Sequence, residues 1–161
     1  MAEIIPAYGH MDQVRTMFYN YVTWIGVPQN FEELEAELAA LPGPYVHPEG
    51  RFFLLREGDE ILGCGAIRPL RNIPGGAGAR RCELKRMLIR PEYRGRGLGR
   101  KLVQHLIDEA RAMGYSEIVM DTLAFTQPVL GTYRRLGFAD IPPYYDNPRK
   151  GLKFLGMKLN S

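Results

Sequence analysis

A glycine-rich segment, Arg94 to Gly99, has the sequence RGRGLG and stands directly before the longest amphipathic pattern in the chain. That pattern predicts a helix closing at Gly114, because its apolar residues recur every three or four positions. The first turn of a helix leaves its backbone amides free, and glycines let an anion approach them closely. The segment therefore predicts a phosphate site, with a simple tight turn as the alternative. The apolar positions are Leu98, Leu102, Val103, Leu106, Ile107, Ala110 and Met113.

Basic residues gather at the same place. Seven of the 21 lysines and arginines lie between positions 85 and 101, although the formal net charge of the whole chain is only +3. This local excess predicts a bound anion there, whereas the net charge alone does not indicate nucleic acid. The residues are Lys85, Arg86, Arg90, Arg94, Arg96, Arg100 and Lys101.

Two common phosphate motifs fit the segment poorly. The nucleotide-binding pattern GxxxxGK[ST] is absent, since Gly99 is followed by Arg100, Lys101 and Leu102. Asp121 stands where the ribose-binding acid of a dinucleotide fold would stand, but the third glycine of that fingerprint is missing. The sequence therefore excludes a P-loop NTPase and disfavours a dinucleotide-binding enzyme.

The segment before the glycines changes its apolar phase. Cys82 and Leu84 share one phase of a two-residue alternation, and Met87 and Ile89 share the other. A regular half-buried strand cannot satisfy both, so a β-bulge around Lys85 and Arg86 is one prediction. A strand buried on both faces is the other.

The order of the elements predicts one α/β domain over residues 1–161. The elements form a mixed, mostly antiparallel sheet of seven strands with helices on both faces, in which the helix after RGRGLG joins two parallel strands. Strands are expected over 3–7, 52–56, 61–68, 82–89, 117–121, 138–141 and 154–159, and helices over 11–26, 30–41, 98–114 and 128–137. The glycine-rich residues 72–79 are expected to form an exposed loop.

Composition excludes several classes of protein. The chain is 45% hydrophobic and has no apolar run near the roughly 20 residues that cross a bilayer. Residues 1–7 carry no basic side chain, unlike a signal peptide, so we expect a protein of the cytosol. The two cysteines, Cys64 and Cys82, are expected to be reduced and buried.

Hydrolytic and metal-dependent chemistries lack their residues. The two serines, Ser116 and Ser161, stand outside any GxSxG pattern, which excludes a typical serine hydrolase. His10, His47 and His105 are scattered without ligand spacing, so no metal is predicted.

Three segments together resemble the GNAT superfamily of acyl-CoA-dependent N-acetyltransferases. They are residues 83–89, the RGRGLG segment, and Tyr133, Leu136, Gly137 and Phe138. The likeness is strong over about residues 52–159, and before them only the order of elements agrees. It implies a GNAT-like acyl-CoA N-acyltransferase fold with acetyl-CoA as the co-substrate. It makes the RGRGLG loop the pyrophosphate site and the backbone of the preceding strand the pantetheine site. The implied cofactor-binding residues are Met87, Leu88, Ile89, Arg94, Gly95, Arg96, Gly97, Leu98, Gly99, Thr126 and Tyr133.

The resemblance also implies catalytic roles. Glu83 matches the general-base glutamate of the superfamily by its spacing from Met87, whose amide would polarise the acetyl carbonyl. Tyr133 matches the acid that protonates the departing thiolate. Structural alternatives exist: a salt bridge from Glu83 to Lys85 or Arg86, and simple core packing for Tyr133. Where many relatives carry an asparagine that holds the CoA arm, this chain has Thr126 and Gln127.

The acceptor is expected to be a small molecule with a primary amine, or an amino-acid-like compound. The two N-terminal helices and residues 144–147 are expected to wall its site, where Tyr144, Tyr145 and Asp146 either cage an ammonium group or form an ordered turn. A protein N-terminus or lysine is the alternative acceptor. A nucleic-acid-binding module and a CoA sensor without turnover are rival functions, although no nucleic acid or membrane partner is expected. The oligomeric state stays open, with a homodimer as one option.

Overall fold

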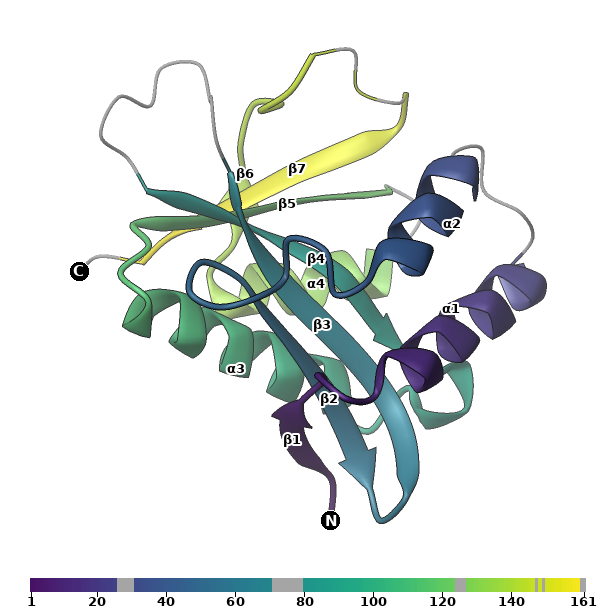
Figure 1. Ribbon diagram of the computed structural model, residues 1–161. Helices are drawn as coiled ribbons and strands as arrows, with labels where there is room; N and C mark the ends of the chain where they lie inside the picture. Colours follow the sequence, from purple (N-terminus) through teal and green to yellow (C-terminus); the bar gives the residue numbers. More distant parts are fainter. Residues whose placement is uncertain (26–30, 71–79, 124–126, 147, 149, 160–161) are drawn as a thin grey trace.

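The computed structural model describes residues 1–25, 31–70, 80–123, 127–146, 148 and 150–159 (Figure 1). A seven-stranded sheet has the order β1-β2-β3-β4-β5-β7-β6. The strands are β1 (Glu3–Pro6), β2 (Arg51–Glu57), β3 (Glu60–Leu70), β4 (Arg81–Ile89), β5 (Glu117–Leu123), β6 (Ala139–Asp140) and β7 (Leu152–Lys158). The helices are α1 (Met11–Ile25), α2 (Phe31–Ala40), α3 (Leu98–Ala112) and α4 (Gln127–Leu136), with a 3-10 turn η1 at Pro91–Tyr93.

The predicted fold class is confirmed. Every neighbouring pair of strands is antiparallel except β4 and β5, which the helix α3 joins as a parallel crossover. The expected cap Asn30, the expected loop 72–79 and Thr126 lie outside the described residues. None of the described helices is long and apolar enough to cross a membrane.

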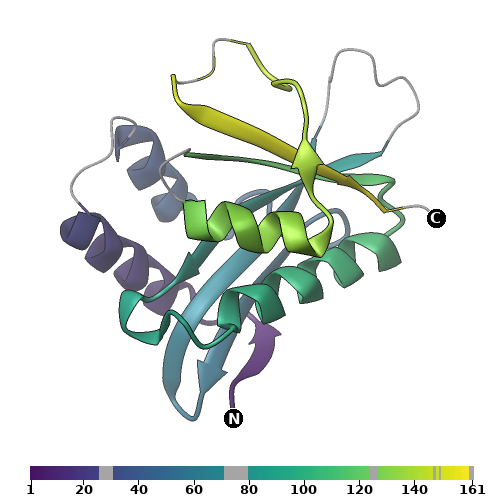
Figure 2. The same cartoon turned by 180° about the vertical axis from the view of Figure 1, so that it is seen from behind.

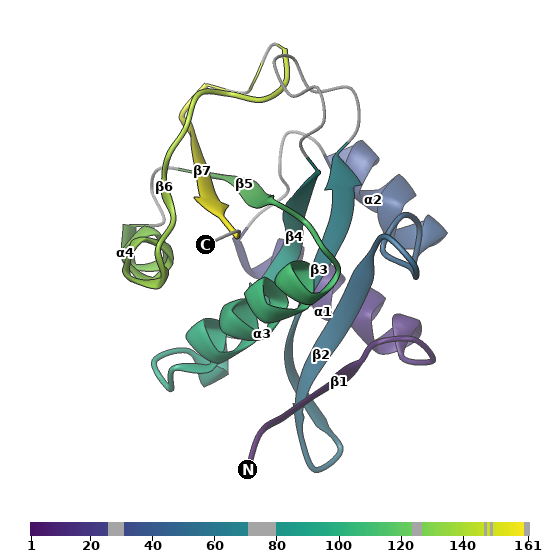
Figure 3. The ribbon, with the colours of Figure 1, turned by 90° about the vertical axis from the view of Figure 1, so that its left-hand side faces the viewer.

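The helices cover both faces of the sheet and divide the core in two. Figure 3 shows α3 and α4 on one side of the strands and α1 and α2 on the other. On the α3 side, Leu102 and Leu106 pack with Ile67 and Leu84. On the α1 side, Val14 and Leu38 belong to the core that contains Phe52 and Leu54. The central strands β2, β3 and β4 therefore present side chains to two different cores.

Both cysteines are buried and free, as predicted. Cys64 lies in the core on the α1 side, whereas Cys82 lies in the core on the α3 side. They therefore belong to opposite faces of the sheet.

Candidate active site

The glycines of RGRGLG form an open turn at the start of α3. Gly95 and Gly97 have φ angles of 84° and 76°, a left-handed conformation that side chains with a Cβ rarely adopt. The first helical hydrogen bond of α3 runs from the Lys101 amide to the Gly97 carbonyl, at 3.2 Å. Within the described part of the chain, the amides of residues 95–100 donate to no backbone carbonyl. This turn can therefore receive an anion on its backbone amides.

The arginines around this turn are held by neighbouring groups. Arg96 pairs with Glu57 at 3.2 Å, and the Nε atom of Arg94 donates to the Ile89 carbonyl at 3.2 Å. Glu60, the first residue of β3, accepts a hydrogen bond from Tyr93 at 2.7 Å. The hydrogen bond from Tyr93 lowers the pKa of the Glu60 carboxyl. The backbone amides of the turn, more than the engaged guanidinium groups of Arg94 and Arg96, are therefore available to an anion.

Strand β4 contains the expected bulge. Lys85 lies opposite Ala66 and Leu88 lies opposite Cys64, so Arg86 and Met87 face a single residue of β3. Arg86 has a φ of 56° and is the one non-glycine residue of the described chain with a left-handed backbone. Such a conformation costs roughly 1–2 kcal/mol for a side chain with a Cβ. The phase change in the sequence therefore marks a strained bulge.

Strand β4 separates from β5 shortly before this bulge. Their parallel register runs from Arg81 opposite Glu117 only to Glu83 opposite Val119. Figures 1 and 2 show β5 and β7 running in a direction different from that of β2, β3 and β4. Among the described residues, no partner on the β5 side pairs with β4 after Glu83, so its edge is free from there to Ile89. The backbone of Met87 and its neighbours is therefore available for a ligand.

The predicted base, Glu83, is buried, with 2% of its surface exposed. Its Oε1 atom accepts a hydrogen bond from Nε of Arg68 at 2.8 Å, and Nη2 of the same arginine lies 2.7 Å away. Its Oε2 atom accepts a hydrogen bond from the hydroxyl of Tyr144. The predicted alternative, a salt bridge from Glu83 to Lys85 or Arg86, is wrong in its partner, because Glu83 pairs with Arg68. Arg68 is the cross-strand neighbour of Glu83, and Arg86 pairs instead with Glu37 of α2.

The segment around Tyr144 spans the point where β4 and β5 part. Tyr144 donates to Glu83 of β4, and Tyr145 donates to Asp121 of β5 at 2.6 Å. Both rings also stack edge-on against Phe154. Residues 144–146 were expected either to cage an ammonium group or to form an ordered turn, and these contacts fit the ordered turn.

The predicted acid, Tyr133, lies on the other side of the sheet. It belongs to α4, has 4% of its surface exposed and packs edge-on against Phe138. Burial raises the pKa of its phenol, so the hydroxyl keeps its proton at neutral pH. Glu83, by contrast, alternates with Cys82 and Leu84 of the α3-side core and therefore faces α1 and α2. Glu83 and Tyr133 therefore lie on opposite faces of the sheet.

Sequence reasoning missed two neighbours of the site. Arg68 follows from the register of β3 against β4, and Glu37 follows from the docking of α2. The hairpin signal around Gly58 and Asp59 sets the register of β2 against β3 and not that of β3 against β4, so it does not mark Arg68. No local pattern marks Glu37.

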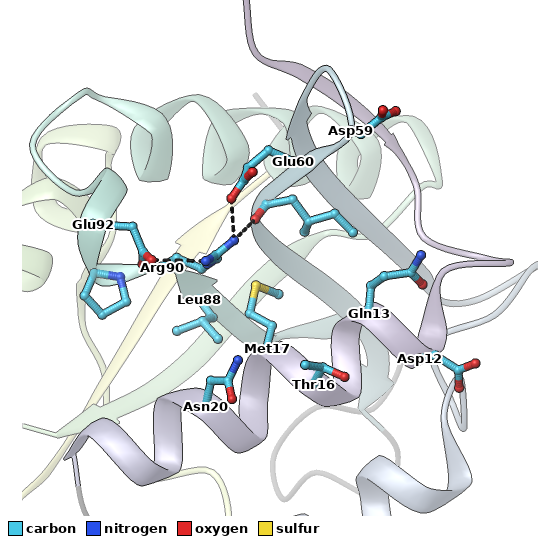
Figure 4. Close-up of a pocket in the computed structure, with 12 residues that line it drawn as sticks. Asp12, Gln13, Thr16, Met17, Asn20, Asp59, Glu60, Leu88, Arg90 and Glu92 are labelled. Carbon is cyan, nitrogen blue, oxygen red and sulfur yellow. Dashed lines mark hydrogen bonds and ion pairs between the residues drawn. The ribbon is translucent and has the colours of Figure 1, made fainter.

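A cavity of about 780 Å³ lies on the α1 side of the sheet, beside the end of β4. Figure 4 shows Arg90 at its edge, where it pairs with Glu60 and Glu92 at 3.0 Å each. Leu88 is the one predicted site residue in its lining. The cavity therefore adjoins the free edge of β4 but does not contain Glu83. Its lining residues are Asp12, Gln13, Thr16, Met17, Asn20, Asp59, Glu60, Ile61, Leu88, Arg90, Pro91 and Glu92.

Comparison with known families decides what this arrangement is. The model of the acetyltransferase (GNAT) family matches residues 14–138. The chain belongs to the GNAT family of acetyltransferases. An uncharacterised N-acetyltransferase of Schizosaccharomyces pombe is 33% identical over 151 residues, which cover 93% of this chain and 89% of the relative.

Solved structures of GNAT proteins share the fold. An acetyltransferase of the GNAT family from Staphylococcus aureus matches with a TM-score of 0.79 at 16% identity, covering 99% of this chain and 100% of that one. A Salmonella typhimurium protein solved with its cofactor acetyl-CoA matches with a TM-score of 0.71 at 22% identity, covering 100% and 95%. This chain is thus an N-acetyltransferase of the GNAT family, whose co-substrate is acetyl-CoA.

The residues present fit acetyl-CoA as the co-substrate of a GNAT enzyme. The free amides of residues 95–100 suit a pyrophosphate, and the unpaired edge of β4 suits an amide-containing arm. No group of histidine, cysteine, aspartate or glutamate side chains in the described ranges is arranged to hold a metal ion.

Proposed function

We propose that residues 1–161 act as one domain that transfers the acetyl group of acetyl-CoA to the primary amine of a small molecule or an amino-acid-like acceptor. The amine attacks the thioester directly. The observation that carries this proposal is the buried carboxylate of Glu83 on the α1 and α2 face, three residues before the strained Arg86 and four before Met87. A location in the cytosol and a homodimer stay predictions.

In this reaction Glu83 acts as the general base. A primary amine with a pKa near about 10 is protonated at neutral pH, so it must lose a proton before or during attack. That proton goes to Oε2 of Glu83, the oxygen that accepts the hydrogen bond from Tyr144. Tyr144 must therefore give up its hydrogen bond when the acceptor binds. Arg68 keeps its bonds to Oε1 and fixes the carboxylate during this exchange.

The amide of Met87 and the hydroxyl of Tyr133 complete the transfer. Acetyl-CoA supplies an activated thioester carbonyl, and the Met87 amide donates to its oxygen as negative charge develops there. A carbon–nitrogen bond forms and the carbon–sulfur bond breaks. The phenolic proton of Tyr133 goes to the sulfur, so that the N-acetylated acceptor and free thiol leave. Glu83 then releases its proton to solvent, and Tyr133 regains one from solvent. Leu88 and Ile89 offer backbone groups to the pantetheine, and Arg94, Gly95, Arg96, Gly97, Leu98 and Gly99 surround the pyrophosphate; Thr126 lies outside the described residues.

The charges near Glu83 support an amino-acid-like acceptor. Lys85 lies two residues beyond Glu83 on the same face and is half-buried. Its ammonium group forms no ion pair or hydrogen bond with another described residue. A carboxylate on the acceptor would meet this cation while the amine meets Glu83.

Thiol release from acetyl-CoA tests the proposal. Purified enzyme is incubated with a panel of amino acids, their carboxamides, simple amines, and peptides with free N-termini or lysines. We expect CoA release with amino-acid-like acceptors, and at least tenfold lower kcat/KM for the matching carboxamides. Release only with peptides would favour the protein acetyltransferase, and no release with any acceptor would contradict enzymatic transfer.

Replacing Tyr133 by phenylalanine is expected to lower kcat by about tenfold at pH 7 and to leave the KM for acetyl-CoA unchanged. The reason is that the thiolate then departs without its proton donor. The deficit should shrink above pH 9, because a thiol with a pKa near about 8.5 leaves as a stable thiolate there. A pH series of kcat measures this.

The matched control is Tyr115→Phe. Tyr115 is also buried, and its hydroxyl donates to the Glu49 carbonyl at 2.6 Å, far along the chain from the site. We expect a lower melting temperature for this control but no change in the pH dependence. If Tyr133→Phe behaves in the same way, Tyr133 is a core residue and not the acid.

A further inference from the structure

Arg86 holds the least favourable backbone conformation of β4. Its φ of 56° belongs to a region that arginine rarely occupies, so neighbouring groups must stabilise it. Met87, the next residue, has no directly opposite residue on β3. The peptide bond between them contains the Arg86 carbonyl and the Met87 amide, which is the amide assigned above to the acetyl oxygen. Whatever orients this peptide bond therefore orients the catalytic donor.

The side chain of Arg86 is fixed from α2. Its guanidinium forms an ion pair with Glu37, and side-chain exposures of 21% and 19% place this pair largely out of water. Tyr45, which is fully buried, donates its hydroxyl to Oε1 of Glu37 at 2.8 Å. Burial lowers the pKa of Arg86, but the Glu37 carboxylate and the Tyr45 hydroxyl together outweigh it, and the pKa is raised. The pair is therefore charged and rigid.

The carbonyl of Arg86 is fixed from β3. The thiol of Cys64 donates to this oxygen, with Sγ 3.2 Å away. Burial raises the pKa of the Cys64 thiol, so the proton that makes this bond stays in place. A trans peptide unit is planar, with its N–H pointing opposite to its C=O. The Met87 amide consequently points away from Cys64 and the α1 side.

We infer that Glu37, Arg86 and Cys64 are positioning residues that together aim the Met87 amide at the acetyl carbonyl. This inference rests on the proposed function, since it assumes the transfer that the Met87 amide assists. The ion pair holds the left-handed conformation, and the thiol sets the rotation of the peptide plane. Because α2 lies on the acceptor side, the same pair links that wall of the site to the oxyanion donor (Figure 3).

The first test compares Arg86→Ala with Arg86→Gly. Both variants lose the ion pair, but glycine adopts a positive φ freely and alanine does not. We expect Arg86→Ala to lower kcat by about 30- to 100-fold, since an oxyanion donor contributes on the order of 100-fold or more. Arg86→Gly should stay within about fivefold of the parent because it retains the bulge. Equal losses in the two variants, or a greater loss with glycine, would overturn the inference.

Affinity for product CoA separates aiming from a general distortion. CoA has no acetyl carbonyl, so its dissociation constant should stay the same in all these variants. A loss of CoA affinity that parallels the loss of kcat would mean that the whole binding edge has moved. Glu37→Gln should lower kcat in the same way, whereas the control Glu35→Gln, from an exposed position of the same helix, should leave kcat unchanged.

The thiol is tested by its own series. Cys64→Ala removes the donor and should lower kcat several-fold, and Cys64→Ser restores a donor and should recover most of it. Cys82→Ala is the matched control, since Cys82 is equally buried and free but lies in the opposite core. Equal kcat values for Cys64→Ala and Cys64→Ser would contradict the role of this hydrogen bond.

An NMR measurement that needs no acetyl transfer tests the inference independently of the proposed function. In protein labelled with ¹⁵N-methionine, and with Met87→Leu used for assignment, acetyl-CoA should shift the Met87 amide proton downfield and CoA should not. Arg86→Ala should lose this shift and Arg86→Gly should keep it. If no amine is acetylated, the proposed function fails while this shift still decides the inference. Equal shifts with both ligands would refute it.

Discussion

Replacing Glu83 by glutamine is expected to lower kcat by about 100-fold or more at pH 7, the range in which a positioned general base contributes. Glutamine preserves the shape of the side chain and an oxygen for Arg68, but it cannot take the amine proton. Arg68 loses its counter-charge, yet its side chain is 34% exposed, so water offsets part of that loss. The expected effect therefore falls on catalysis more than on folding.

The pH dependence of kcat shows whether the loss in Glu83→Gln comes from the missing base. Without Glu83, the attacking amine must already be neutral, and below its pKa of about 10 the neutral fraction rises tenfold per pH unit. The deficit of Glu83→Gln should therefore be largest at low pH and shrink toward pH 10. Rates across this range, at saturating acetyl-CoA and with an acceptor from the panel, provide the measurement.

Glu117→Gln is the control for this experiment. Glu117 is also buried, with 8% of its surface exposed, and it pairs with Arg81 and Lys158 at the opposite end of the β4 and β5 pairing. Its replacement should lower the melting temperature and leave the pH profile of kcat unchanged. Glu83 is not the base if the two variants lose activity equally, or if the loss from Glu83→Gln is the same at every pH.

The parts of the site that the sequence predicts correctly are encoded locally. The phase change between Leu84 and Met87 predicts either a bulge or a strand buried on both faces, because strand alternation depends only on neighbouring residues, and the register shows the bulge. The start of α3 after Gly97 follows in the same way from helical periodicity and the glycine before it. Both predictions are confirmed because no distant contact is needed to produce them.

The partners of the key groups depend on distant contacts, and these escaped prediction. Arg68 lies 15 positions before Glu83 and meets it only because β3 and β4 pair in one particular register. Glu37 reaches Arg86 only after α2 docks on the sheet. A left-handed arginine also has no sequence signal, since that conformation favours glycine and asparagine. The sequence thus predicts the framework, whereas the charge pairing arises from tertiary structure.

Replacing Gly97 by valine is expected to raise the KM for acetyl-CoA by about 10- to 100-fold, because hydrogen bonds to a charged group contribute about 1.5–3 kcal/mol and 1.4 kcal/mol corresponds to a factor of ten. Gly97 has a φ of 76° and caps α3, so a β-branched residue must rotate the backbone and turn the free amides away. The acceptor does not contact this turn in the proposed function. Its KM should therefore change by less than about threefold, a difference of under 1 kcal/mol.

Gly9→Val separates this effect from backbone strain alone. Gly9 has a φ of 93°, and a Cβ placed there meets no atom within 4 Å, as at Gly97. Valine should strain both positions by a similar roughly 1–2 kcal/mol and lower both melting temperatures. Only Gly97→Val should weaken acetyl-CoA, because only that glycine shapes the anion site. An unchanged KM for acetyl-CoA in Gly97→Val, or an equal rise in Gly9→Val, would remove the RGRGLG turn as the pyrophosphate site, and the roles that depend on it would fail with it.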